Sequence, residues 1–186
     1  SAKQYAQRVV SGEILTCEWV QKACKRQLDD LIRFKRKSSI YQFNPELLDR
    51  YGRPYRPADN LCSFIERLPP VKGPLASRMI VLEPWQVFIL STVFGWVKSD
   101  GKRRFRRSYI EVPRGNAKST LSSAVGLYML AADREGGAEV YSLATTRDPL
   151  PYLTYRLLLL LPLLVVSPPP PPMYCPIKLH NHSRLR

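Results

Sequence analysis

Apolar positions recur at helical spacing along three long stretches of the chain. In residues 16–37 an apolar stripe repeats every four positions, which predicts an amphipathic helix. A second helix is predicted over residues 85–97, directly after Pro84, and a third over residues 119–132. The apolar positions of the third helix are Leu121, Ala124, Val125, Tyr128 and Met129.

Shorter signals lie between these stretches. Asn44 followed by Pro45 predicts a short helix over residues 44–50, with Asn44 as its cap and Pro45 at its first position. Residues 51–57, rich in glycine and proline, predict a loop, and residues 64–68 predict a further helical stretch.

Two segments alternate like strands. Arg107–Val112 is rich in β-forming residues, and Glu139–Ala144 follows a stop signal at Gly136 and Gly137. A strand, a helix and a second strand at this spacing are typical of a parallel α/β sheet. The predicted fold class is therefore α/β.

The turn between the first strand and the third long helix reads Val-Pro-Arg-Gly-Asn-Ala-Lys-Ser-Thr over residues 112–120. A strand, a turn ending in Lys-Ser and a helix are the context of a phosphate-binding loop, or P-loop. In such a loop backbone N–H groups converge on the phosphates, and Lys118 neutralises their charge. The Ser119 hydroxyl would bind Mg²⁺, and Arg114 would stabilise charge on the γ-phosphate in the transition state. The candidate nucleotide-binding residues are Pro113, Arg114, Gly115, Asn116, Ala117, Lys118, Ser119 and Thr120, with Lys118 and Arg114 as candidate catalytic residues.

This segment departs from the common pattern GxxxxGK[ST] at two positions. Val112 stands at the first glycine and Ala117 at the glycine before the lysine, so only Gly115 remains in the loop. The alternative interpretation is a basic turn that caps the following helix through Ser119.

The charge of the chain favours a polyanionic partner such as nucleic acid. It has 29 Lys and Arg against 15 Asp and Glu, a net charge of +14. The alternative to a polyanionic partner is a generically basic protein. The Arg103–Arg107 run predicts an exposed basic loop. The apolar run over residues 157–166 is too short to span a bilayer, which predicts no membrane partner. No signal-peptide pattern opens the chain, and we expect a cytoplasmic location.

Residues 149–186 differ from the rest of the chain. They hold nine of the 17 prolines, and no Asp or Glu follows Asp148. This segment has three interpretations, namely a proline-rich docking segment, a disordered end, or the product of a shifted reading frame, which we favour because the change is abrupt. The expected organisation is a helical region over 1–60, part of an ATPase domain over 61–148 and a disordered or aberrant tail over 149–186.

Several motifs in order resemble the ATPase domain of tailed-phage terminase large subunits, over about residues 1–148. These motifs occupy residues 65–69, 71–74, 82–86, 94–96, 103–107, 112–120 and 137–142. The resemblance implies a RecA-like P-loop sheet, ATP and Mg²⁺ as cofactors, and an enzyme that uses ATP hydrolysis to drive double-stranded DNA into a procapsid. It also implies a terminase small subunit and a portal as partners, and the cytoplasm of a host cell or of a bacterium that carries the gene as a prophage.

The resemblance also assigns roles to residues outside the loop. Trp85 and Gln86 match the family's adenine-recognition motif, in which Gln86 can hydrogen-bond to both edges of adenine while Trp85 packs nearby. The alternative is one core residue beside one surface residue on a helix. Arg114 matches the loop arginine proposed to act in catalysis.

Acidic residues that the family requires have no counterpart in the sequence. The family carries a Walker B Asp-Glu pair on a later strand and clustered carboxylates in its nuclease. Because no acid follows Asp148, we expect a truncated chain that binds ATP but lacks efficient hydrolysis and nuclease activity. The alternatives are a helicase-like P-loop ATPase, a non-enzymatic basic DNA-binding protein and a nonfunctional frameshifted product.

Overall fold

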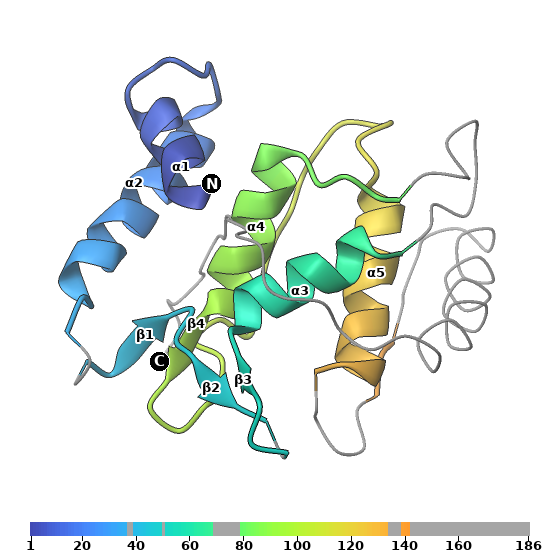
Figure 1. Ribbon diagram of the computed structural model, residues 1–186. Coiled ribbons are helices and arrows are strands. Elements are labelled where there is room, and N and C mark those ends of the chain that lie inside the picture. The colour runs from blue at the N-terminus through green and yellow to red at the C-terminus, as the bar shows by residue number, and fades with distance from the viewer. Residues whose placement is uncertain (37–38, 50, 69–78, 134–138, 142–186) are drawn as a thin grey trace. The chain divides into compact units, whose positions relative to one another are not determined.

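The computed structural model describes residues 1–36, 39–49, 51–68, 79–133 and 139–141 (Figure 1). The described residues fall into two units. The first comprises residues 1–63 and 82–111, and the second comprises residues 64–68, 79–81, 112–133 and 139–141. Each unit is described by itself below. The tail over 149–186 lies outside the described residues.

The first unit begins with a hairpin of two helices, α1 (Ala2–Val10) and α2 (Glu18–Arg33). The helix predicted over residues 16–37 is confirmed as α2, which is shorter at both ends. Ala6 and Val9 of α1 pack with Cys24 of α2 and with Phe88, which belongs to α4 (Pro84–Gly95). Because these apolar side chains share one core, the helical hairpin and residues 84–95 form one structural body.

Two short antiparallel strand pairs complete the first unit. Strand β1 (Tyr41–Phe43) pairs with β4 (Trp96–Lys98), and β2 (Leu47–Leu48) pairs with β3 (Pro54–Tyr55). Helices and strands together agree with the predicted α/β class in its broad sense. The described residues contain no parallel strand pair, so the parallel P-loop sheet stays a prediction.

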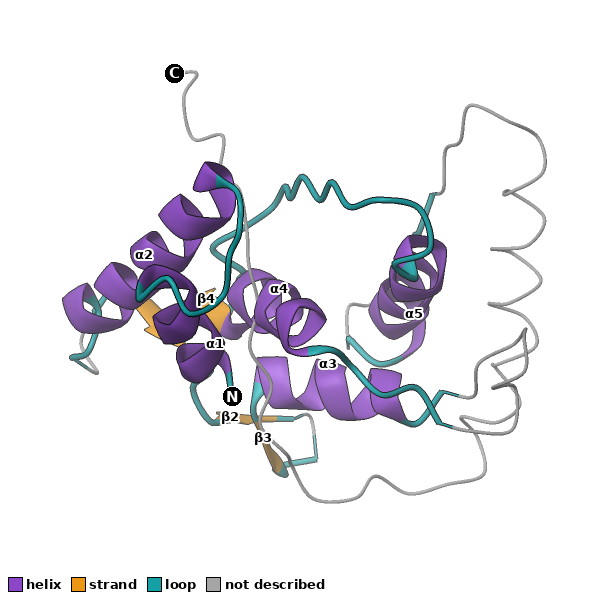
Figure 2. Ribbon diagram, turned by 90° about the horizontal axis from the view of Figure 1, so that it is seen from above, coloured by secondary structure: helices purple, strands orange, loops and turns teal. Residues whose placement is uncertain are grey.

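The strand predicted over Arg107–Val112 is wrong for the structure, which shows irregular chain there (Figure 2). An alternating sequence forms a strand only where a neighbouring strand satisfies its backbone N–H and C=O groups. Within the described part of the chain no strand pairs with this segment. Residues 139–141 are also irregular, while Gly136, Gly137 and residues 142–144 lie outside the described residues.

Asn44 caps a helix, although not the one that the local sequence predicts. Residues 44–49 contain β2 and no helix, and Asn44 has a positive φ of 47°. Its side-chain oxygen instead accepts a hydrogen bond, 3.0 Å long, from the backbone N–H of Ala58 in the first turn of α3 (Pro57–Glu66). The short helix predicted over residues 44–50 is therefore wrong, and Asn44 bonds instead to a helix that begins at Pro57.

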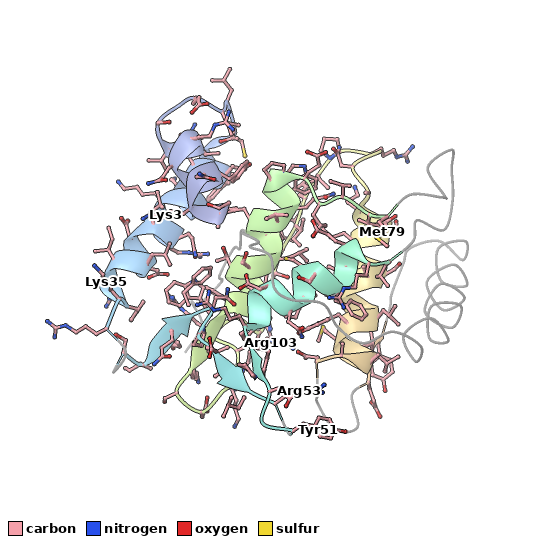
Figure 3. All side chains as sticks on the ribbon, viewed as in Figure 1. Lys3, Lys35, Tyr51, Arg53, Met79 and Arg103 are labelled. Carbon is pink, nitrogen blue, oxygen red and sulfur yellow. The ribbon has the colours of Figure 1, made fainter. Side chains whose placement is uncertain are left out.

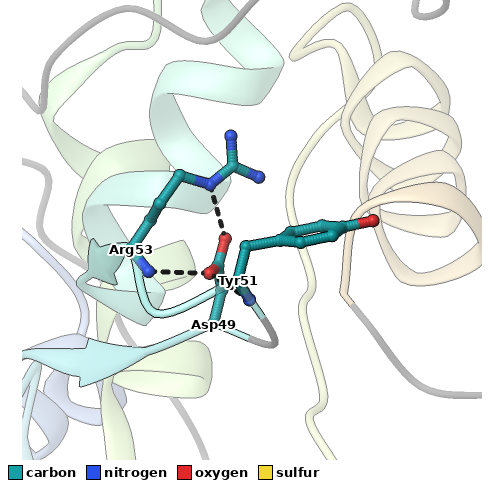
Figure 4. A network of polar contacts seen from close by, with 3 residues as sticks. All are labelled: Asp49, Tyr51 and Arg53. Atoms are coloured by element: carbon teal, nitrogen blue, oxygen red, sulfur yellow. Dashed lines mark hydrogen bonds and ion pairs between the residues drawn. The ribbon is translucent and has the colours of Figure 1, made fainter.

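The hairpin between β2 and β3 is closed by Asp49, with Tyr51 and Arg53 at its tip (Figures 3 and 4). The Asp49 carboxylate accepts hydrogen bonds from the backbone N–H groups of Tyr51 and Arg53, both 2.8 Å, and from Arg53 Nε at 3.0 Å. These donors, the Arg53 N–H foremost, hold the pKa of Asp49 below its usual value. The hairpin thus gives local order to a segment predicted as a loop.

The second unit is built around α5 (Lys118–Ala131), which confirms the helix predicted over residues 119–132. Leu121, Ala124 and Tyr128 are buried along one side of α5, as the sequence pattern predicts. Tyr128 meets Phe64 edge to face with ring centroids 5.4 Å apart. No helix within the described ranges is both long and apolar enough to span a bilayer.

Candidate functional site

The segment from Val112 to Ala117 is an irregular turn that leads into α5. Gly115 has a φ of +87°, a left-handed conformation that glycine adopts without a steric penalty. Ala117 is also left-handed, with φ 53° and ψ 26°, and the helical conformation begins at the next residue, Lys118. The sequence Pro-Arg-Gly-Asn supports such a turn, because Pro113 cannot continue a strand ladder and Gly115 permits a positive φ.

This backbone geometry suits an anion. A left-handed residue next to a right-handed one turns successive N–H groups toward one point, the arrangement known as an anion-binding nest. Ala117 has no side-chain hydrogen bond to cap α5, unlike a serine or aspartate at that position. The first-turn N–H groups of α5 therefore have no side-chain cap from Ala117 and carry the positive end of the helix dipole.

Two polar side chains of the loop donate hydrogen bonds to backbone carbonyls of the same loop. Lys118 Nζ donates a 2.7 Å hydrogen bond to the carbonyl of Val112, and Asn116 Nδ2 donates a 3.3 Å bond to the carbonyl of Pro113. Both side chains belong to exposed residues. The Lys118 ammonium is consequently held at the start of the loop, beside the Val112 carbonyl.

The remaining loop residues differ in how far they are exposed. Arg114 and Ser119 are exposed, and among the described residues no hydrogen bond or ion pair engages the Arg114 side chain. Ser119 occupies the second position of α5, and its backbone carbonyl accepts a 2.7 Å bond from the Ser123 hydroxyl. Thr120 is half-buried. An exposed hydroxyl in the first helical turn is a hard oxygen donor that fits Mg²⁺.

Trp85 and Gln86 lie in the first unit, at the start of α4. Gln86 is 7% exposed, and its Oε1 accepts a 3.0 Å hydrogen bond from the backbone N–H of Glu83. Gln86 therefore closes the N-terminus of α4 in the manner of a capping box, a role that its position three residues after Glu83 could have signalled. Recognition of adenine by Trp85 and Gln86 stays a prediction.

The Arg103–Arg107 run is not the uniformly exposed basic loop that the sequence predicts. Phe105 is 4% exposed, Arg103 and Arg104 are half-buried, and only Arg106 and Arg107 are exposed. Arg104 Nη1 lies 2.9 Å from Asp30 Oδ2 of α2, with the side chains 16% and 10% exposed. The run is thus divided between the interior and the surface because one apolar residue, Phe105, anchors its middle in the core.

Aromatic rings surround the buried Arg104 guanidinium. Its Cζ lies between 4.7 and 5.1 Å from the ring centroids of Phe34, Tyr41, Trp96 and Phe105. Beside this cluster, Trp96 Nε1 donates a 2.8 Å hydrogen bond to Gln27 Oε1 of α2. Burial lowers the pKa of the neighbouring Arg26 and Arg104 adds to this effect, whereas Asp30 opposes it. We call Asp30, Arg104 and Trp96 the Arg104 cluster. The sequence pattern does not predict this cluster, because a count of charges carries no information about burial.

Replacing Ala117 with glycine is expected to stabilise the second unit by about 1 kcal/mol, because an L-residue pays roughly that amount in the left-handed region. Urea unfolding of the full chain measures the change. Ala124→Gly is the matched control, since it places glycine in the right-handed interior of α5 and should destabilise by about 1 kcal/mol. If both variants destabilised the protein equally, Ala117 would not occupy the left-handed conformation.

The comparison with known families covers the start of α4 in the first unit and the loop before α5 in the second unit. Residues 84–152 match the family described as terminase large subunit, ATPase domain. The matched segment begins at Pro84, next to Trp85 and Gln86, and includes the whole loop from Val112 to Thr120. No curated protein and no solved structure matches the chain. Residues 84–152 of this chain are therefore similar to the ATPase domain of terminase large subunits.

Proposed function

We propose that the loop over residues 112–120 binds the phosphates of ATP, as a variant P-loop within a terminase ATPase domain. The observation that carries this proposal is the left-handed Ala117, which stands directly before the first turn of α5 and offers it no side-chain cap. This conformation turns backbone N–H groups toward one point beside the Lys118 ammonium. The common pattern GxxxxGK[ST] has glycine at the position of Ala117. Ala117 adopts the left-handed conformation that glycine favours, so this departure from the pattern does not exclude a phosphate-binding loop.

Each loop residue has a role in this proposal. Lys118 leaves the carbonyl of Val112 and pairs with the β- and γ-phosphates, while backbone N–H groups of the loop that begins at Pro113 enclose them. Proline supplies no N–H, so that contribution starts at Arg114. Arg114 is exposed, and its side chain forms no hydrogen bond or ion pair with the residues that the structure describes. In this proposal it contacts the γ-phosphate. Ser119 binds Mg²⁺, which when bound neutralises charge on the phosphates.

We infer that the wider function is that of the family, namely use of ATP to move double-stranded DNA into a procapsid, in the cytoplasm, together with a small subunit and a portal. The nucleotide site would then lie at the edge of a parallel RecA-like sheet. The carboxylates that orient Mg²⁺ and the attacking water come from a later strand in such enzymes. Because residues 149–186 contain no Asp or Glu, this chain is expected to bind ATP with negligible turnover.

The direct test is titration of the full 186-residue chain with a fluorescent ATP analogue, with and without Mg²⁺, alongside a phosphate-release assay. Saturable binding that is stronger with Mg²⁺, without steady-state hydrolysis, supports the proposal. Absence of binding at millimolar nucleotide overturns it, and robust turnover overturns the inference about the missing carboxylates.

The adenine role of Gln86 can be separated from its helix-capping role by Gln86→Glu. Glutamate keeps the oxygen that accepts the Glu83 N–H but cannot donate to a ring nitrogen of adenine, so ATP affinity should fall by about tenfold while GTP affinity changes little. Competition between ATP and GTP measures this preference, and circular dichroism verifies that α4 persists.

Gln21→Glu on α2 is the matched control for Gln86→Glu, because it makes the same chemical change at an exposed position. If Gln86→Glu left ATP affinity and the ATP preference unchanged, Gln86 would serve only to cap α4.

A further inference from the structure

Three exposed cations follow one another along the segment that leaves β4. Lys102, Arg106 and Arg107 are exposed, whereas Arg103 and Arg104 between them are half-buried. Arg103 lies over the ring of Phe94, with its Cζ 4.4 Å from the centroid. Arg104 is engaged with Asp30 and the surrounding rings. We call Lys102, Arg106 and Arg107 the outer cations.

The inner residues hold this segment in place. Phe105 is 4% exposed and packs with Trp96 in the core. The backbone N–H of Arg104 also donates a 2.9 Å hydrogen bond to the carbonyl of Trp96. Because Arg106 and Arg107 directly follow these fixed residues, their attachment points are restricted before any partner binds. Restricting the backbone in advance lowers the entropy cost of binding.

The two acidic residues that flank the outer cations in sequence accept hydrogen bonds from other donors. Glu111 accepts a 3.0 Å hydrogen bond from the Tyr109 hydroxyl, and Asp100 accepts one from the backbone N–H of Lys102, also 3.0 Å. Within the described ranges, neither Arg106 nor Arg107 forms an ion pair, whereas Arg8, Arg53 and Arg104 each do. The exposed guanidinium groups of Arg106 and Arg107 are therefore available to an anionic partner.

We propose that the outer cations bind the phosphate backbone of double-stranded DNA, at a site distinct from the nucleotide-binding loop. The choice of DNA rests on the proposed function and on the chemistry of the segment. Arginine matches phosphate oxygens with two parallel N–H donors. The apolar side chain between Lys102 and Arg107, that of Phe105, is buried, so this segment offers a partner charged groups and no exposed apolar side chain. The net charge of +14 adds long-range attraction for a polyanion.

The test uses the full chain and a fluorescently labelled 30-base-pair duplex, with affinity measured by anisotropy between about 50 and 200 mM salt. The variant Arg106→Gln/Arg107→Gln removes two phosphate contacts, so the slope of log affinity against log salt should become shallower by about 2. DNA affinity at the lower salt should fall on the order of tenfold.

The matched control is Lys25→Gln/Arg33→Gln on α2, which removes the same charge from exposed positions of the same unit. Equal losses in both double variants would overturn the proposal, because only net charge would then matter. Weakened binding to polyglutamate with unchanged DNA binding would also overturn it in favour of an acidic protein partner.

Lys118→Ala tests the nucleotide site separately, since it should remove ATP binding and leave the DNA salt slope intact.

Discussion

Lys118→Ala is expected to lower the affinity of the chain for both ATP and ADP by about 100-fold, the value of two charge-assisted hydrogen bonds. The Lys118 ammonium already lies at the loop, 2.7 Å from the Val112 carbonyl, so nucleotide binding exchanges one acceptor for phosphate oxygens. Both nucleotides lose affinity because both carry the β-phosphate that lysine contacts. Calorimetric titration with each nucleotide in the presence of Mg²⁺ gives the two constants.

Arg114→Ala provides the comparison for this result. If Arg114 contacts only the γ-phosphate, its loss weakens ATP by about tenfold and leaves ADP unchanged. The two variants thus differ in their ADP affinity, and a general loss of folding would affect both nucleotides in both proteins. Unchanged ATP affinity in Lys118→Ala would contradict the phosphate-loop proposal, and the exposed helix N-terminus would then be only a structural turn.

Asp30→Ala is expected to lower the free energy of unfolding by about 3 to 5 kcal/mol, the usual cost of breaking a buried ion pair from one side. The carboxylate lies 2.9 Å from Arg104 Nη1, and Arg26 lies near both groups. Its removal leaves the Arg104 guanidinium in a largely buried aromatic environment without the carboxylate that pairs with it. Urea unfolding followed by tryptophan fluorescence is suitable, because Trp96 belongs to the Arg104 cluster and is fully buried.

The adjacent Asp29 supplies the control for Asp30→Ala. Asp29 precedes Asp30 on α2 but is exposed, so Asp29→Ala should change the free energy of unfolding by no more than about 0.5 kcal/mol. Similar small losses in the two variants would show that the Arg104 cluster contributes little to stability. A large loss at Asp30 alone would show that α2 is fastened to β4 and its following segment through this ion pair.

The locally determined features of the chain were predictable from sequence. Helices α2, α4 and α5 agree with the predicted helices to within a few residues, because a helix makes its backbone hydrogen bonds within its own segment. The loop before α5 was located by its Gly-Asn-Ala-Lys-Ser sequence, whose positive-φ glycine and lysine are local properties.

Features that depend on distant partners were not predictable in the same way. Residues 107–112 alternate like a strand, yet within the described ranges no neighbouring strand completes them. Asn44 is a residue type that often caps helices, and Pro45 after it suggests a local helix. In the folded chain the Asn44 side chain instead accepts a hydrogen bond from the backbone N–H of Ala58. Gln86 matches a family motif and also the capping position of α4, and the sequence alone gave no means of separating these roles.

By itself, the sequence determined the positions of the long helices, the lysine-bearing loop at the start of α5 and the resemblance to a terminase ATPase domain, since each follows from residues close together in the chain. The tertiary structure decided which charges are available for binding. Arg104 is enclosed by aromatic rings and paired with Asp30, 74 positions away in the sequence, while Arg106 and Arg107 remain exposed. The reason is physical: burial depends on side chains that meet only after folding, and the same residue type is a structural group in the core and a potential ligand-binding group at the surface.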